Sequence, residues 1–105
     1  MATQIDISSQ IDELEGMIDL LLGEVSELQS FAMSKFRDPQ EFLSLFEKIR
    51  ELRSELKNLK VTIIELRKAS SSVTDIEGFQ QQLSSIKKLL MDIKSRINSL
   101  RNIII

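Results

Sequence analysis

A chain of 105 residues with a formal net charge of −2 has room for one domain and a modest hydrophobic core. Its 42% hydrophobic and 29% charged residues argue against global disorder, and the near-balanced charge favours no polyanionic partner. The lack of cysteine excludes a disulfide framework and a thiolate metal site. Since there is neither a signal-peptide pattern nor an apolar run long enough to span a membrane, we expect a soluble, cytoplasmic protein.

The first predicted helix covers residues 7–36. Apolar residues recur along it at alternating spacings of four and three, the a/d heptad pattern of a helix that faces a partner helix. These seam positions are Ile7, Ile11, Leu14, Ile18, Leu21, Val25, Leu28 and Ala32. The helix is predicted to end near Phe36, because the residue before Pro39 is biased away from the helical region. The candidates for its amino-terminal cap are Thr3, Asp6 and Ser9.

The second predicted helix, residues 39–68, opens with a compact start signal. Asp38 is placed to cap it, Pro39 suits the first helical position, and Glu41 has the spacing of a capping-box acid. Its seam positions are Phe42, Leu45, Ile49, Leu52, Leu56, Leu59, Ile63 and Leu66. The very short connection predicts that the first two helices are antiparallel neighbours, with one long kinked helix as the alternative.

The third predicted helix covers residues 75–102. Residues 69–74 lose charge and gain hydroxyl groups, which is typical of a loop, and Thr74 with Glu77 then forms a second capping box. Its seam positions are Ile76, Phe79, Leu83, Ile86, Leu90, Ile93, Ile97, Leu100 and Ile104. Every seam position of the three helices is apolar.

The three seams predict an all-α fold, a left-handed coiled-coil bundle of three long antiparallel helices in up-down-up order forming a single domain over residues 1–105. An acidic first helix between two mildly basic ones favours mutual contact. Completion of the bundle by oligomerisation, with helices exchanged between chains, is an open alternative. The plan is similar to that of spectrin-type repeats, but their expected tryptophan is missing and we assign no family.

The residue types on which most enzymes depend are missing, because the chain has no histidine, cysteine, tyrosine or tryptophan. Its carboxylate pairs lie on solvated helix faces, and its three glycines are isolated rather than grouped in a phosphate loop. We therefore expect no catalytic site, cofactor, metal, small-molecule substrate or membrane contact.

Apolar residues at outward heptad positions predict a protein-binding surface, with a widened core stripe as the alternative. These residues are Leu20, Met33, Leu43, Val61, Ile64, Met91 and Ile105. Apolar residues at the flanking e and g positions are expected to join the core, and they are Met17, Leu22, Phe31, Phe36, Phe46, Leu89 and Ile103.

Two further features are candidates for a partner interface. One outward stripe of the first helix consists of Gly16, Leu20 and Gly23, and its small residues leave room for another backbone to approach. The alternative is that the glycines are neutral sequence changes that a stable helix tolerates. At the opposite end of the chain, the tail either packs onto its own bundle or into another subunit, and its residues are Ile103, Ile104 and Ile105.

Two basic stripes at e positions are candidates for contacting a phosphate backbone, and they comprise Arg53, Lys60, Arg67 and Lys87, Lys94, Arg101. In coiled coils, however, e positions ordinarily pair with acids of the neighbouring helix. We therefore expect a non-catalytic protein–protein interaction or assembly subunit, such as an adaptor, scaffold or accessory chain that self-associates or joins a larger complex. A small nucleic-acid-associated subunit is the alternative.

Overall fold

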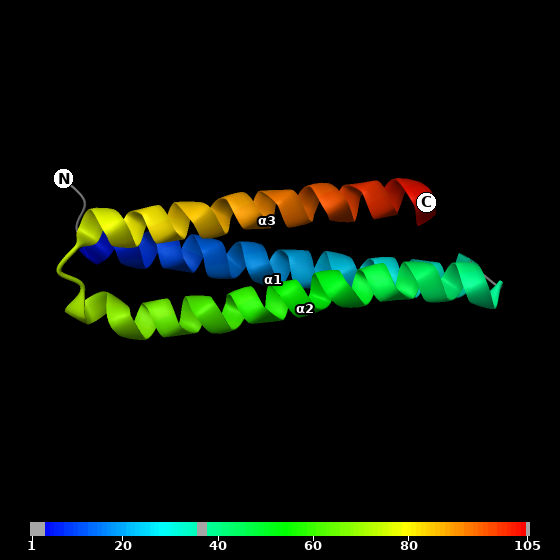
Figure 1. Cartoon of the computed structure of the whole chain (residues 1–105), viewed down its shortest axis with the longest axis horizontal. Coiled ribbons are helices and arrows are strands. Elements are labelled where there is room, and N and C mark those ends of the chain that lie inside the picture. The colour runs from blue at the N-terminus through cyan, green and yellow to red at the C-terminus, as the bar shows by residue number, and fades with distance from the viewer. Residues whose placement is uncertain (1–3, 36–37, 105) are drawn as a thin grey trace.

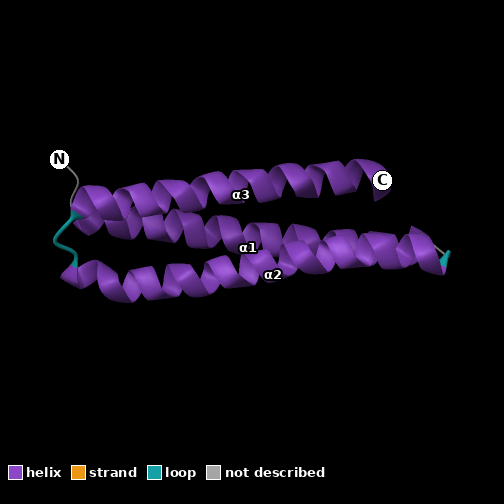
Figure 2. Ribbon diagram, in the orientation of Figure 1, coloured by secondary structure: helices purple, strands orange, loops and turns teal. Residues whose placement is uncertain are grey.

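The computed structural model describes residues 4–35 and 38–104 as three long helices joined by short connections (Figures 1 and 2). Helix α1 spans Gln4–Lys35, α2 spans Pro39–Ala69 and α3 spans Ile76–Ile104, with a 3-10 turn, η1, at Ser70–Ser72. Helices α1 and α3 run in the same direction and α2 runs back between them in the chain, which confirms the predicted three-helix bundle. The Cα atoms extend over 54 × 20 × 16 Å, so the molecule is a rod. The left-handed supercoil and oligomerisation stay predictions.

The helix boundaries differ from the predicted ones by a few residues. Helix α1 begins at Gln4 rather than residue 7, so Asp6 and Ser9 lie inside the helix and do not cap it. Helix α3 extends to Ile104, two residues beyond the predicted end, because the buried Ile104 continues its seam. Thr3 and Phe36 lie outside the described residues.

The predicted start of α2 is confirmed at Asp38 and Pro39, whereas the capping-box role of Glu41 stays a prediction. The Asp38 carboxylate Oδ1 accepts a hydrogen bond from the Gln40 N–H at 3.0 Å, and the Asp38 carbonyl accepts one from the Phe42 N–H at 3.0 Å. Pro39 occupies the first turn, where no N–H is needed. The side-chain bond satisfies one orphan donor of the first turn, and such a cap is worth about 1 kcal/mol.

The predicted cap of α3 is wrong by one residue. Asp75, not Thr74, holds the first turn, with its Oδ1 accepting from the Gly78 N–H at 3.0 Å and its carbonyl accepting from the Phe79 N–H at 3.1 Å. A carboxylate also interacts favourably with the positive end of the helix dipole, which a threonine hydroxyl does not match.

The core is built entirely from the predicted seams, since every buried apolar side chain of the described residues occupies a seam position. Removing each such side chain from water contributes roughly 1.5–3 kcal/mol, and their sum holds the helices together. The seam residues that are only half-buried are Phe42, Leu59, Leu66 and Ile76.

Helix α1 is the central element of the bundle. It packs along both α2 and α3, whereas α2 and α3 contact each other only sparsely. Consequently all the seam residues of α1 are buried, with at most 3% of any side chain exposed. The half-buried Leu59 and Leu66 belong to the α2 face that turns toward α3, where the bundle is least closed.

Candidate protein-binding surface

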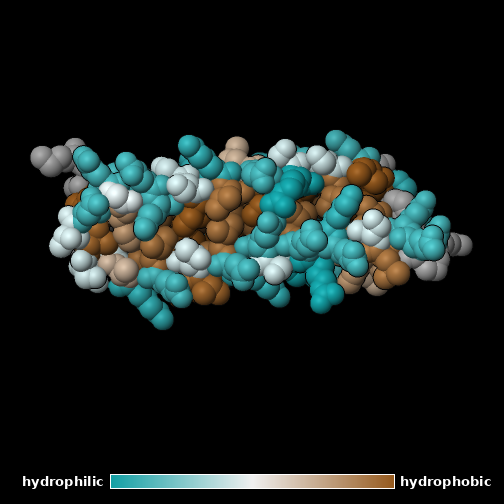
Figure 3. All heavy atoms as spheres, viewed as in Figure 1, coloured by the Kyte–Doolittle hydropathy of each residue, from teal (hydrophilic) through white to brown (hydrophobic). Residues whose placement is uncertain are grey.

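An open groove, here the α2–α3 groove, runs along the bundle between these two helices. Three hollows follow one another along it, with volumes of about 450, 210 and 320 Å³. The first lies beside the α2–α3 connection, between Leu66 and Phe79. Figure 3 shows apolar side chains gathered along the middle of this face of the molecule, with polar side chains on both sides and polar side chains that cross the apolar area at one place.

The second and third hollows are mainly apolar. The middle hollow is lined by Glu55, Asn58, Leu59, Thr62, Leu89, Ile93 and Arg96. The outer hollow is lined by Lys48, Glu51, Leu52, Arg96, Ser99, Leu100 and Ile103. Their floors are seam residues of α2 and α3, so the groove exposes part of the surface that heptad patterning normally buries.

Arg96 separates the two hollows. Its Nη2 lies 2.7 Å from Glu55 Oε2 on α2, and its Nε lies 3.2 Å from Asp92 Oδ2 one turn earlier on α3. Among the described residues, the pair of Arg96 with Glu55 is the salt bridge that links α2 to α3. A single exposed pair contributes at most about 1 kcal/mol and does not close the groove.

The other two helix–helix boundaries are bridged by the predicted basic stripes. Between α1 and α2, Lys60 Nζ lies 2.8 Å from Asp19 Oδ1, and Arg67 Nη2 lies 2.7 Å from both Asp12 Oδ1 and Glu15 Oε2. In addition, Arg53 donates a hydrogen bond to Gln29 of α1. Between α1 and α3, Lys87 Nζ lies 3.3 Å from Glu13 Oε1.

Four of the six candidate nucleic-acid-binding bases are therefore turned toward α1, as e positions of a coiled coil ordinarily are. The other two, Lys94 and Arg101, continue the α3 stripe toward the carboxyl-terminal end. The six residues do not form one open basic face.

The ion pairs with α1 raise the pKa values of two bases. The pKa of Lys60 lies above its ordinary value because Asp19 accepts its hydrogen bond and attracts its charge. The pKa of Arg67 is raised because Asp12 and Glu15 both accept hydrogen bonds from it. A raised pKa in the folded state means that the pairing of Lys60 stabilises the fold below about pH 10.4 and is lost as the pH rises through the folded pKa.

Replacing Arg67 by glutamate should lower the stability of the fold, because it removes two pairs and places a third acid beside Asp12 and Glu15. Urea unfolding at low and high salt would measure the effect, and the difference from wild type should shrink at high salt. Lys68→Glu, on the exposed side of the same turn, is the control. Equal effects of the two changes would contradict the pairing with α1.

The outward apolar candidates are exposed wherever the structure describes their side chains. The exposed fractions are 63% for Leu20, 61% for Met33, 59% for Leu43, 55% for Val61, 41% for Ile64 and 55% for Met91. Ile104, in contrast, is fully buried in the core of its own chain, and Ile105 lies outside the described residues.

Three residues expected in the core are exposed. The exposed fractions are 44% for Phe31, 52% for Leu89 and 57% for Ile103, although all three occupy flanking g positions. In a closed bundle the g position of α3 is covered by α2, but the wide separation of the two helices leaves Leu89 on the rim of the groove. The exposure of Leu89, the partial exposure of Leu59 and the bridge made by Arg96 were therefore not predictable from heptad position.

The glycine stripe lies on an open face of α1. A Cβ atom at Gly16 or Gly23 has no neighbour within 4 Å, whereas one at Gly78 meets the Cγ of the capping Asp75 at 2.9 Å. Gly16→Ala and Gly23→Ala should each stabilise the monomer by roughly 0.5–1 kcal/mol, since alanine is the better helix former. Gly78→Ala is the matched control and should stabilise less or destabilise, because it disturbs the cap.

Chemical denaturation of the three glycine variants measures these differences, and light scattering of the Gly16→Ala, Gly23→Ala double variant tests the stripe as an interface. Higher stability with weaker assembly would support the interface. Higher stability with unchanged assembly would show that the stripe is ordinary surface.

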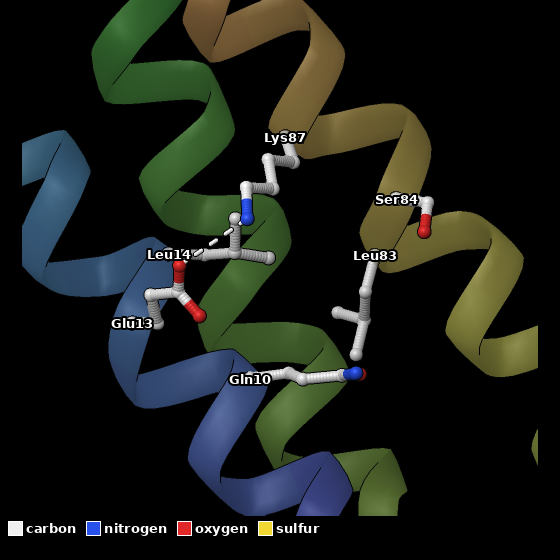
Figure 4. Close-up of a pocket in the computed structure, with 6 residues that line it drawn as sticks. All are labelled: Gln10, Glu13, Leu14, Leu83, Ser84 and Lys87. Carbon is white, nitrogen blue, oxygen red and sulfur yellow. Dashed lines mark hydrogen bonds and ion pairs between the residues drawn. The ribbon is translucent and has the colours of Figure 1, made fainter.

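A smaller hollow of about 130 Å³ lies between α1 and α3 and is drawn in Figure 4. The ion pair of Glu13 with Lys87 crosses one side of it, and Leu14 and Leu83 provide apolar walls. The Oε1 atom of Gln10 is buried there without a hydrogen-bond partner. Ser84 also lines this hollow, and Figure 4 shows its hydroxyl directed away from Glu13 and Lys87.

The geometry defines a three-helix bundle with an apolar groove along one side. Over residues 4–35 and 38–104, no group of acidic side chains is arranged to hold a metal ion. None of the described helices is both long and apolar enough to cross a membrane. Comparison of the chain with protein-family models, curated proteins and solved structures gives no match.

Proposed function

We propose that this chain is a non-catalytic protein–protein interaction or assembly subunit, which acts by self-association or as an accessory chain of a larger complex. The observation that carries the proposal is the α2–α3 groove, an apolar strip along the rod where heptad seams lie open. Long apolar patches of this kind, bordered by polar residues, are typical of surfaces that bind another protein.

The charge arrangement supports protein contact over the nucleic-acid alternative. Four of the candidate bases are already engaged with α1, and the groove itself carries acids as well as bases on its rims. A phosphate-binding surface needs a continuous basic path, since neutralised phosphates supply most of the affinity.

The proposal is tested first by the solution mass of the full chain, measured by light scattering over a wide range of concentration. A dimer or larger assembly supports it. If the chain is a monomer, a tagged form is purified from cells of its source together with any protein bound to it. A partner that is present in fixed stoichiometry, and that charged substitutions of the exposed apolar residues release, supports the proposal. The proposal fails if the chain is monomeric and recovers no stoichiometric partner.

A salt titration distinguishes the alternative function. Binding to duplex or single-stranded nucleic acid that falls steeply with salt would favour the nucleic-acid-associated subunit. In that case Lys94→Glu and Arg101→Glu should weaken binding without lowering stability, because these two residues lie outside the pairs with α1 described above.

A further inference from the structure

Two exposed apolar side chains stand on the α3 rim of the groove at equal distances from Arg96. Leu89 precedes Arg96 by seven residues and Ile103 follows it by seven, so the three lie along one line of α3, about 10 Å apart. Leu89 lines the middle hollow, Ile103 lines the outer hollow, and Arg96 lines both. The groove therefore repeats the same plan, an apolar hollow with an exposed apolar residue on its rim, on each side of a central arginine.

We propose that a second copy of this chain occupies the α2–α3 groove, related to the first by a two-fold axis that passes near Arg96. This inference rests on the proposed assembly function and specifies its partner. A two-fold axis at Arg96 runs α3 antiparallel to α3 of the second copy, which places Leu89 opposite Ile103 of that copy and Ile103 opposite its Leu89. Each middle hollow then faces an outer hollow of the other copy.

The charges of the groove fit such a self-contact. In the middle and outer hollows the basic residues are Lys48 and Arg96 and the acids are Glu51 and Glu55, so the lining of these two hollows is neutral in sum. The pair of Arg96 with Glu55 lies at the centre. Each Arg96 guanidinium is paired with Glu55 and Asp92 of its own chain, and across a two-fold axis it would also face Glu55 of the second copy, an opposite charge that favours the contact.

Burial by a second copy also accounts for Leu59, a seam residue that one chain leaves partly exposed beside the middle hollow. Leu59 on α2 is half-buried in the monomer although it occupies a seam position, and Leu89 is 52% exposed beside it. A facing α3 helix would cover both. An isologous contact of this kind is self-complementary, so it closes as a dimer instead of extending into a fibre.

The test is sedimentation equilibrium of the full chain and of two double variants. Leu89→Lys with Ile103→Lys should weaken dimerisation by about 100-fold or more, since two central apolar anchors are lost. Leu20→Lys with Val61→Lys is the control pair, and it tests two candidate interface residues that do not line the middle or outer hollow. Their exposed fractions are 63% and 55% against 52% and 57%, and if the groove is the interface this pair should change dimerisation by less than about three-fold. Circular dichroism checks that each variant is folded.

If the lysine variant does not fold, Leu89→Ala with Ile103→Ala replaces it, and a weakened dimer again supports the proposal. Two results overturn the proposal: a chain that is monomeric at all concentrations, or a dimer that responds to the control pair and not to the groove pair. In the first case the search for a partner in fixed stoichiometry still tests the assembly function, and a helix of another protein would then occupy the α2–α3 groove. In the second case the function stands and the interface lies elsewhere.

Discussion

Replacing Val25 by aspartate should unfold the protein at neutral pH, whereas the same substitution at Val61 should leave its stability nearly unchanged. Val25 belongs to α1 and is fully buried, while the side chain of Val61 on α2 is 55% exposed. A buried carboxylate without a partner loses several kcal/mol of hydration, which is comparable to the whole stability of about 5–15 kcal/mol of a small domain. The surface change stays within about 0.5 kcal/mol.

Far-ultraviolet circular dichroism with urea unfolding of the two variants measures this difference. Because both substitutions introduce the same residue in place of valine in a helix, helix propensity cancels in the comparison. Similar stabilities of the two variants would show that α1 is not the enclosed helix of the bundle.

Replacing Leu56 by alanine should destabilise the protein by about 2–5 kcal/mol, and replacing Leu59 should destabilise it by roughly half as much. Both are seam leucines of α2, one turn apart. Leu56 is fully buried, whereas Leu59 lines the middle hollow and is half-buried. Truncation of Leu56 leaves a cavity in the core, while truncation of Leu59 enlarges a hollow that is already open.

This comparison is made by urea unfolding in the Leu89→Ala, Ile103→Ala background, so that assembly does not add to the measured stability. The same two truncations in the wild-type chain then provide a second result. If a second copy fills the groove, the effect of Leu59→Ala should grow toward that of Leu56→Ala as the protein concentration rises. Equal effects in the monomeric background would mean that the groove is closed in solution.

The sequence alone determined the number of helices, their order and the composition of the core. Heptad position fixes the angle at which a side chain leaves its helix, so a continuous apolar seam identifies the buried stripe without knowledge of the partner. For the same reason the start of α2 was predictable, because Asp38 and Pro39 act within a single turn. At α3, Thr74 and Asp75 are both good caps, and local pattern did not separate them.

Which edge of the bundle stays open depends on how the three helices pack against one another. The three seams are equally apolar, yet the seam side chains of α1 are enclosed from two sides while Leu59 and Leu89 border the groove. The difference arises because the separation of two helices depends on how all three seams pack together. Similarly, the sequence alone allows Arg67 to be part of an exposed basic stripe. Arg67 meets Asp12, 55 residues away in the chain, only because α2 folds back along α1. Heptad position gives the direction of a side chain, whereas the distance to the next helix is a property of the assembled core.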